Sequence, residues 1–241
     1  MWYSYFDPLY WLLLAVGGGL SLLATLLVKG TFATYSQVGT RAGLTGAQVA
    51  ELILRRNGIH DVRVEPVSGS LSDHYDPRGK VLRLSEPVYA SDSLAAFGVA
   101  AHEVGHAIQD ARGYAPLRFR SAWVPVANVA GGFSMFVIFA AFLLGGVQTA
   151  AGTAAAWLGI ALFGTTTVFT LVTLPVEFDA SRRALQTLER EGLMDPDELA
   201  AARKVLRAAA LTYVAAFVSS LLMLLYYAYR LGLLGGGRRD D

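Results

Sequence analysis

The five residues from His102 to His106 read HEVGH and match the pattern H-E-x-x-H. Residues four apart lie one above the other on a helix, so both imidazoles can reach the same ion. Zinc lowers the pKa of a coordinated water to roughly 7, and a neighbouring carboxylate can accept its proton as the water attacks a carbonyl group. We therefore predict His102 and His106 as zinc ligands and Glu103 as the general base.

The residues around the motif support a helix. The preceding run, 93–101, reads SLAAFGVAA and has an apolar helical pattern, with Ser91 or Asp92 expected as its N-cap. Gly105 has no side chain beside the metal, so another element can cross closely there. An ordinary helix with two histidines and a glutamate is the alternative. Half of the chain's four histidines fall in this register, which a solvated surface does not explain.

A catalytic zinc site needs a third protein ligand and an open fourth position. The chain has no cysteine, so that ligand must be His, Asp or Glu. Glu177 is the first candidate, and Asp179 and Asp110 are the alternatives. Pro175 suits the first turn of a helix, so the alternative is that Glu177 and Asp179 simply complement a helix N-terminus. Asp179 could instead orient a ligand histidine.

The composition points to a membrane protein. The chain has 241 residues, of which 54% are hydrophobic and 16% charged, and its mean hydropathy is +0.43. A net charge of +1 gives no hint of nucleic-acid binding. A bilayer span needs about 20 apolar residues. Four stretches qualify, about 9–28, 123–144, 153–174 and 208–229, and the first is expected to be an anchor and not a cleaved signal peptide. Buried core helices of a soluble protein are the alternative.

Basic residues predict the topology. Segment 29–122 carries eleven Lys and Arg and segment 175–207 carries six, whereas the link between the second and third spans carries none. Because such residues stay in the cytoplasm, both segments are expected there, in a multi-pass protein of the inner (plasma) membrane. The tail with Arg238 and Arg239 would then lie outside, which conflicts with the rule unless the fourth span is re-entrant. The expected parts are 1–28, 29–122, 123–174, 175–207 and 208–241.

The segment before the motif is predicted to be a small α/β region. Residues 45–57 are amphipathic, with Thr45 as cap and Gly58 as terminator. Residues 61–67 and 80–84 alternate like strands and flank turn residues at 76–79, which predicts a hairpin. An exposed strand edge can bind an extended peptide, although a purely structural hairpin is equally compatible with the pattern.

Several polar residues are further candidates. His74 or Tyr75, in the predicted hairpin, could donate a hydrogen bond to an oxyanion, although a turn histidine is often only polar surface. Arg182 and Arg183 could bind a carboxylate or support the oxyanion. The alternative is that these arginines anchor the protein at the membrane edge.

Five motifs carry a family resemblance: NGI at 57–59, DHYDP at 73–77, VLRLS at 81–85, AAHEVGHAIQ at 100–109 and LPVEFDAS at 174–181. With them, nearly the whole chain resembles the YugP-type zinc-dependent membrane peptidases of bacteria, and more distantly the HtpX-like and CAAX-processing peptidases. The distant resemblance implies a third-ligand glutamate on a later helix, four residues before an aspartate. Glu177 matches the glutamate, but position 181 is serine, which makes Asp179 the expected substitute.

These observations predict a mainly α polytopic membrane protein with a small cytoplasmic zincin-like α+β portion. The predicted function is a gluzincin-like zinc endopeptidase, with one Zn²⁺ per chain, that acts on peptides or membrane proteins at the bilayer. The alternative is a membrane scaffold or assembly protein with a structural zinc, for which His74 or Asp179 would be the extra ligand. A transporter is disfavoured because the spans lack ionisable groups. Small residues such as Gly131 and Gly132 leave a homo-oligomer open.

Overall fold

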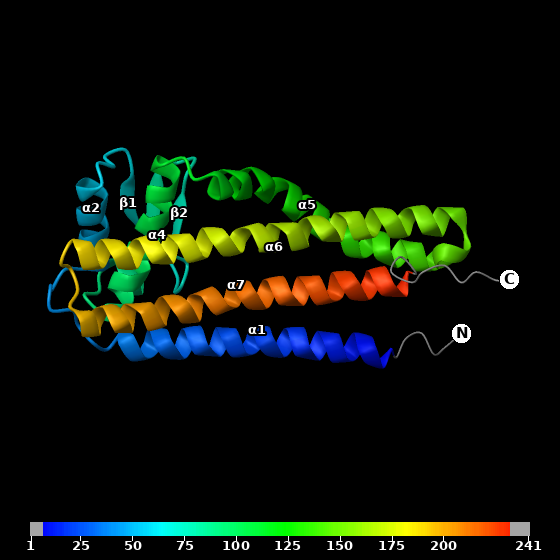
Figure 1. Ribbon diagram of the computed structural model, residues 1–241, viewed down its shortest axis with the longest axis horizontal. Coiled ribbons are helices and arrows are strands. Elements are labelled where there is room, and N and C mark those ends of the chain that lie inside the picture. Colours follow the sequence, from blue (N-terminus) through cyan, green and yellow to red (C-terminus); the bar gives the residue numbers. More distant parts are fainter. Residues whose placement is uncertain (1–6, 232–241) are drawn as a thin grey trace. The chain divides into compact units, whose positions relative to one another are not determined.

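The computed structural model describes residues 7–231, and within them the chain is mainly helical (Figure 1). Four of these helices are long and apolar enough to cross a membrane: α1 (Pro8–Tyr35), α5 (Ala115–Leu143), α6 (Ala150–Arg190) and α7 (Pro196–Arg230). Each contains one predicted span, so the expected class, a mainly α polytopic membrane protein, is confirmed. The predicted side of the C-terminal tail falls on residues outside the described part.

One helix boundary was predicted wrongly. Pro175 was expected in the first turn of a new helix, but it lies inside α6, which runs without a break to Arg190. An internal proline removes one backbone hydrogen bond, and membrane helices tolerate this where neighbouring groups compensate. Pro125 lies inside α5 in the same way. Glu177 is therefore far from the N-terminus of its helix, and the alternative that it only complements a helix N-terminus is wrong.

The described residues form two compact units. One, here called the apolar unit, comprises residues 7–22, 120–172 and 213–231, and the other, the site unit, comprises 23–119 and 173–212. In the apolar unit, large side chains such as Phe136 (74% exposed) face outward, as a lipid-facing surface requires. Polar contacts link its helices: Ser219 Oγ donates to the Gly17 carbonyl at 3.2 Å, and the Thr170 and Ser220 hydroxyls lie 3.0 Å apart.

The site unit contains α2 (Gly46–Arg56), β1 (Arg63–Val67), β2 (His74–Asp76), β3 (Val81–Ser85), α3 (Glu86–Tyr89) and α4 (Leu94–Ala111). The prediction for α2 is confirmed. Thr45 Oγ1 accepts from the Gln48 backbone N–H while the Gln48 side chain accepts from that of Thr45, a reciprocal capping box. Gly58, with φ +71°, ends the helix in the left-handed conformation that glycine adopts without strain.

The sheet corrects the predicted hairpin. Its strand order is β1-β3-β2, and β1 runs parallel to β3, with Arg63 opposite Val81. The antiparallel partner of β3 is β2, and the turn between them is held by Asp76, whose carboxylate accepts from the backbone N–H groups of Arg78 and Gly79. The turn was therefore predicted correctly and the strand partner was not. Alternating polarity shows which residues can form strands but does not choose among partners.

Helix α4 begins one or two residues later than predicted. Its N-cap is Ser93, whose Oγ accepts from the Ala96 backbone N–H at 3.2 Å. The two residues predicted as the cap make other hydrogen bonds. The backbone carbonyls of Ser91 and Asp92 accept from the backbone N–H groups of Gly46 and Thr40, respectively. The helix is the centre of the hydrophobic core, where Phe97, Ala100 and Val104 are buried with residues of α2, β3, α6 and α7. This packing fixes the helix that carries the H-E-x-x-H motif.

Candidate metal centre

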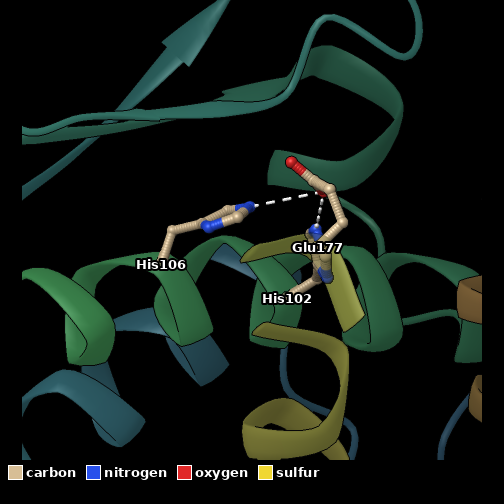
Figure 2. Close-up of side chains that lie close together, drawn as sticks. All are labelled: His102, His106 and Glu177. Atoms are coloured by element: carbon tan, nitrogen blue, oxygen red, sulfur yellow. Dashed lines mark hydrogen bonds and ion pairs between the residues drawn. The ribbon is translucent and has the colours of Figure 1, made fainter. Parts of the chain in front are cut away.

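Two helices of the site unit bring the three predicted ligands together. His102 and His106 lie one turn apart on α4, and Glu177 approaches from α6. Glu177 Oε2 lies 3.2 Å from His102 Nε2 and 3.6 Å from His106 Nε2. Figure 2 shows this one carboxylate oxygen facing both imidazoles. His102 and Glu177, which this arrangement brings together, are 75 residues apart in the sequence.

The residues fit a zinc ion. One ligand atom from each residue lies within 4.8 Å of the other two. Atoms about 2.1 Å from a shared tetrahedral ion lie about 3.4 Å apart, so only small adjustments are needed. Two imidazole nitrogens and one carboxylate oxygen also suit zinc chemically. Glu177 is 2% exposed and His106 7%, whereas His102 is partly exposed, which leaves the centre an approach from solvent.

The close crossing of α4 and α6 depends on Gly105. A Cβ at this position would lie 2.5 Å from the Ala180 carbonyl oxygen, a distance that real Cβ atoms do not adopt. The crossing point lies between the two ligand histidines on α4 and just after Glu177 on α6. The expectation that another element crosses at Gly105 is therefore met, and that element is the one that carries the third ligand.

Gln109 orients the imidazole of His106. Its Nε2 donates to the Val176 carbonyl at 2.8 Å and to Asp179 Oδ2 at 2.9 Å. Because both amide protons are used, Gln109 Oε1, 3.0 Å from His106 Nδ1, must accept from that ring nitrogen. In the neutral ring this assignment puts the proton on Nδ1 and leaves the Nε2 lone pair for a metal.

Ser181 performs the same task for His102. Its Oγ lies 3.1 Å from His102 Nδ1, so the hydroxyl oxygen can accept that ring proton and leave Nε2 for a metal. Asp179, the expected substitute for the missing aspartate, reaches the other histidine instead and does so through Gln109. It is buried and paired with Arg182 and Arg183. Asp179 therefore supports the centre from outside the group of three.

The remaining candidates in the site unit are Glu103, which lies within the motif, and Asp110, Tyr75 and His74, which lie outside the group of three ligands. Glu103 is buried on α4 beside His102. Asp110, an alternative third ligand, accepts from Tyr75 Oη at 2.8 Å and from Lys80 Nζ at 2.7 Å and lies outside the group. Burial and the hydrogen bond to Asp110 raise the pKa of the Tyr75 phenol, so it stays protonated at neutral pH. His74 is exposed, with Nδ1 2.8 Å from the Ser72 carbonyl.

Sequence reasoning missed Gln109. The available signal was an amide side chain three residues after His106, on the same face of an otherwise apolar helix. A buried amide needs hydrogen-bond partners, so its presence there indicated a polar network beside the metal ligands. The role of Ser181 was missed as well, because its hydroxyl was seen only as a departure from aspartate.

Comparisons with known proteins agree with this centre. A family described as "Putative neutral zinc metallopeptidase" matches residues 10–232. The chain belongs to this family. It is 47% identical over 209 residues to the "Putative membrane protease YugP" of Bacillus subtilis, which covers 87% of this chain and 90% of that protein. No solved structure matches. The predicted resemblance is confirmed, and together with the four apolar helices it supports a multi-pass membrane protein.

Proposed function

We propose that this protein is a zinc-dependent membrane endopeptidase that uses His102, His106 and Glu177 as metal ligands. The observation that carries the proposal is the convergence of these residues at an α4–α6 crossing that only a glycine permits. Among the described residues, 7–231, the group has three members, whereas a structural zinc site is closed by four. Three ligands leave a position for catalysis, so this group favours an enzyme over a scaffold.

The proposed mechanism assigns separate tasks to the surrounding residues. Zinc would supply Lewis acidity, which polarises a carbonyl group and acidifies water. Gln109 and Ser181 hold the two imidazoles in the tautomer that directs Nε2 toward the ion. Glu103 accepts a proton from the attacking water and transfers it to the leaving amine. Its burial reduces competition from bulk water for that proton.

The proposed peptide-binding element is β2. It is an edge strand of the sheet, next to β3 on one side only, and it packs against α4. A free edge offers backbone N–H and C=O groups that pair with an extended peptide. His74 and Tyr75 lie on this strand, and their assignment as oxyanion donors stays a prediction. We also propose that the site faces the cytoplasm, because segments 29–122 and 175–207 hold most of the basic residues.

A three-variant comparison tests the assignment. We expect Glu103→Gln to retain zinc and lose cleavage of a peptide or membrane-protein substrate, because it keeps the metal ligands but removes the base. Glu177→Gln should lose both. Glu189→Gln, an exposed glutamate on the same helix, should lose neither. Metal analysis and proteolysis of the purified full chain measure both properties, and normal cleavage by Glu103→Gln would overturn the mechanism.

A further inference from the structure

A polar pocket of about 160 Å³ in the site unit is not used by the proposed reaction. Its walls come from the end of α2, the last turn of α4 and the segment of α6 after Glu177. The lining residues are Asn57, Ile108, Arg112, Asp179, Arg182, Arg183, Gln186, Thr187 and Arg190. Asp179 also belongs to the hydrogen-bond network of His106, so the pocket adjoins the metal centre without including its ligands.

Positive charge dominates this pocket. Four of the lining residues are arginines, and Asp179 is the only carboxylate in the lining. Glu191, outside the lining, pairs with Arg190 and also with Arg56. Asp179 is already held by Arg182 and Arg183. Asp179 and Glu191 carry two negative charges against the four positive charges of the arginines, so at least two guanidinium charges are not neutralised by them. Positive groups that line one pocket repel one another, and an anion among them relieves that repulsion.

We infer that this pocket binds a phosphate group. Guanidinium groups present paired N–H donors that match phosphate oxygens, and such charge-assisted hydrogen bonds are strong. A phosphate monoester carries a charge of about −1.5 to −2 at pH 7 and three acceptor oxygens, which several arginines can share. A carboxylate has one charge and two oxygens, which a single arginine satisfies. The Gln186 amide and the Thr187 hydroxyl, also in the lining, supply neutral donors.

The position of the arginines along α6 bears on the source of the phosphate. Arg182 and Arg190 follow the predicted apolar stretch, which ends near residue 174, by about 12 and about 24 Å of helix at 1.5 Å per residue. The headgroup layer on each side of a bilayer is about 5 to 8 Å thick. Both distances exceed that thickness, which favours a soluble phosphate compound over a lipid headgroup as the occupant.

The test is titration calorimetry of the zinc-loaded, detergent-solubilised full chain with inorganic phosphate and with pyrophosphate at constant ionic strength. The pocket variant is Arg112→Gln/Arg190→Gln, which changes two exposed arginines that do not hold Asp179. The matched control is Arg55→Gln/Arg203→Gln, which removes the same charge from exposed positions of the site unit outside the lining. Both variants keep the metal ligands, so phosphate bound directly to zinc would affect them equally.

We expect saturable binding to the wild type and the control, and at least about tenfold weaker binding to the pocket variant, the effect of about one lost charge-assisted hydrogen bond. Equal affinities in the two variants, or no saturable binding to the wild type, would overturn the inference. Repeating the titration in phosphatidylglycerol and phosphatidylcholine nanodiscs identifies the source. Loss of phosphate binding only in phosphatidylglycerol supports a lipid headgroup as occupant, and unchanged binding in both supports a soluble phosphate.

Discussion

Gly105 on α4 lies against the backbone of Ala180 on α6, where an added Cβ would be 2.5 Å from the Ala180 carbonyl oxygen. The turn of α4 at this contact carries His102 and His106, and the turn of α6 before Ala180 carries Glu177. The interhelical spacing at this glycine therefore sets the distance between the imidazole nitrogens and the carboxylate.

The first prediction concerns this spacing. Gly105→Ala should force the two helices apart, because the new methyl group meets backbone and not a flexible side chain. We expect a loss of about 1–3 kcal/mol in the free energy of unfolding and reduced zinc content. Gly98→Ala is the control on the same buried helix: its Cβ would meet Ala202 at an ordinary 3.5 Å. That variant should be neutral or gain up to about 1 kcal/mol from helix propensity. Equal behaviour of the two variants would contradict the role of the crossing.

The second prediction concerns removal of the metal. Zinc that binds only the folded protein stabilises it, by about 2.7 kcal/mol when free zinc is 100 times the dissociation constant. We therefore expect a chelator to lower the Tm and added zinc to restore it. Glu177→Gln should not respond to zinc, because it removes the carboxylate that faces both imidazoles. Thermal unfolding with and without the chelator measures this, and a normal zinc response in that variant would exclude Glu177 as a ligand.

Much of the site followed from local patterns in the sequence. The spacing of His102 and His106 fixes their common face on a helix, and an apolar run before them predicts burial. The α2 cap at Thr45 was also predictable, because both halves of the capping box lie within four residues. Glu177 required one further step: the charge distribution put its segment on the same side of the membrane as the motif.

The features that sequence reasoning got wrong depend on tertiary contacts. Three consecutive residues, 91–93, are all good caps, and the choice of Ser93 follows from hydrogen bonds that Ser91 and Asp92 make with residues 40–46. Local preference places proline in the first turn of a helix, yet α6 continues through Pro175. The prediction that β1 and β3 form a hairpin was wrong because the alternating pattern of β1 fits a parallel neighbour as well as an antiparallel one. In each case a distant contact decided between locally equivalent choices.

The third prediction concerns Gln109. Gln109→Met keeps the volume of this fully buried side chain but leaves His106 Nδ1 without its acceptor and Asp179 without one of its donors. Loss of such support beside a metal ligand usually weakens metal binding about 10- to 100-fold. We expect a loss in this range for the zinc affinity, measured by competition with a chromophoric chelator. An unchanged affinity would mean that the amide does not orient the histidine.

The fourth prediction uses the serine at position 181. Ser181→Ala removes a single neutral acceptor from His102, so we expect a smaller loss of zinc affinity than for Gln109→Met. Ser181→Asp should instead tighten zinc binding. A carboxylate accepts a stronger hydrogen bond from His102 Nδ1 than a hydroxyl does, and this makes Nε2 more basic. The same competition assay measures both variants. Weaker zinc binding in Ser181→Asp than in Ser181→Ala would show that charge at this position is unfavourable.

The last prediction separates two roles of Tyr75. Tyr75→Phe removes the hydrogen bond to Asp110, which should cost about 1 kcal/mol of the free energy of unfolding whatever the residue does in catalysis. In the predicted role as oxyanion donor, Tyr75 would turn its single O–H proton from Asp110 to the substrate, and Tyr75→Phe would then lower kcat about 10²- to 10³-fold. Asp110→Asn is the control for kcat, since it weakens the same contact, together with the ion pair to Lys80, and keeps the phenol. We expect both variants to lose stability and only Tyr75→Phe to lose kcat; equal kcat values in the two would assign Tyr75 to the support of α4 alone.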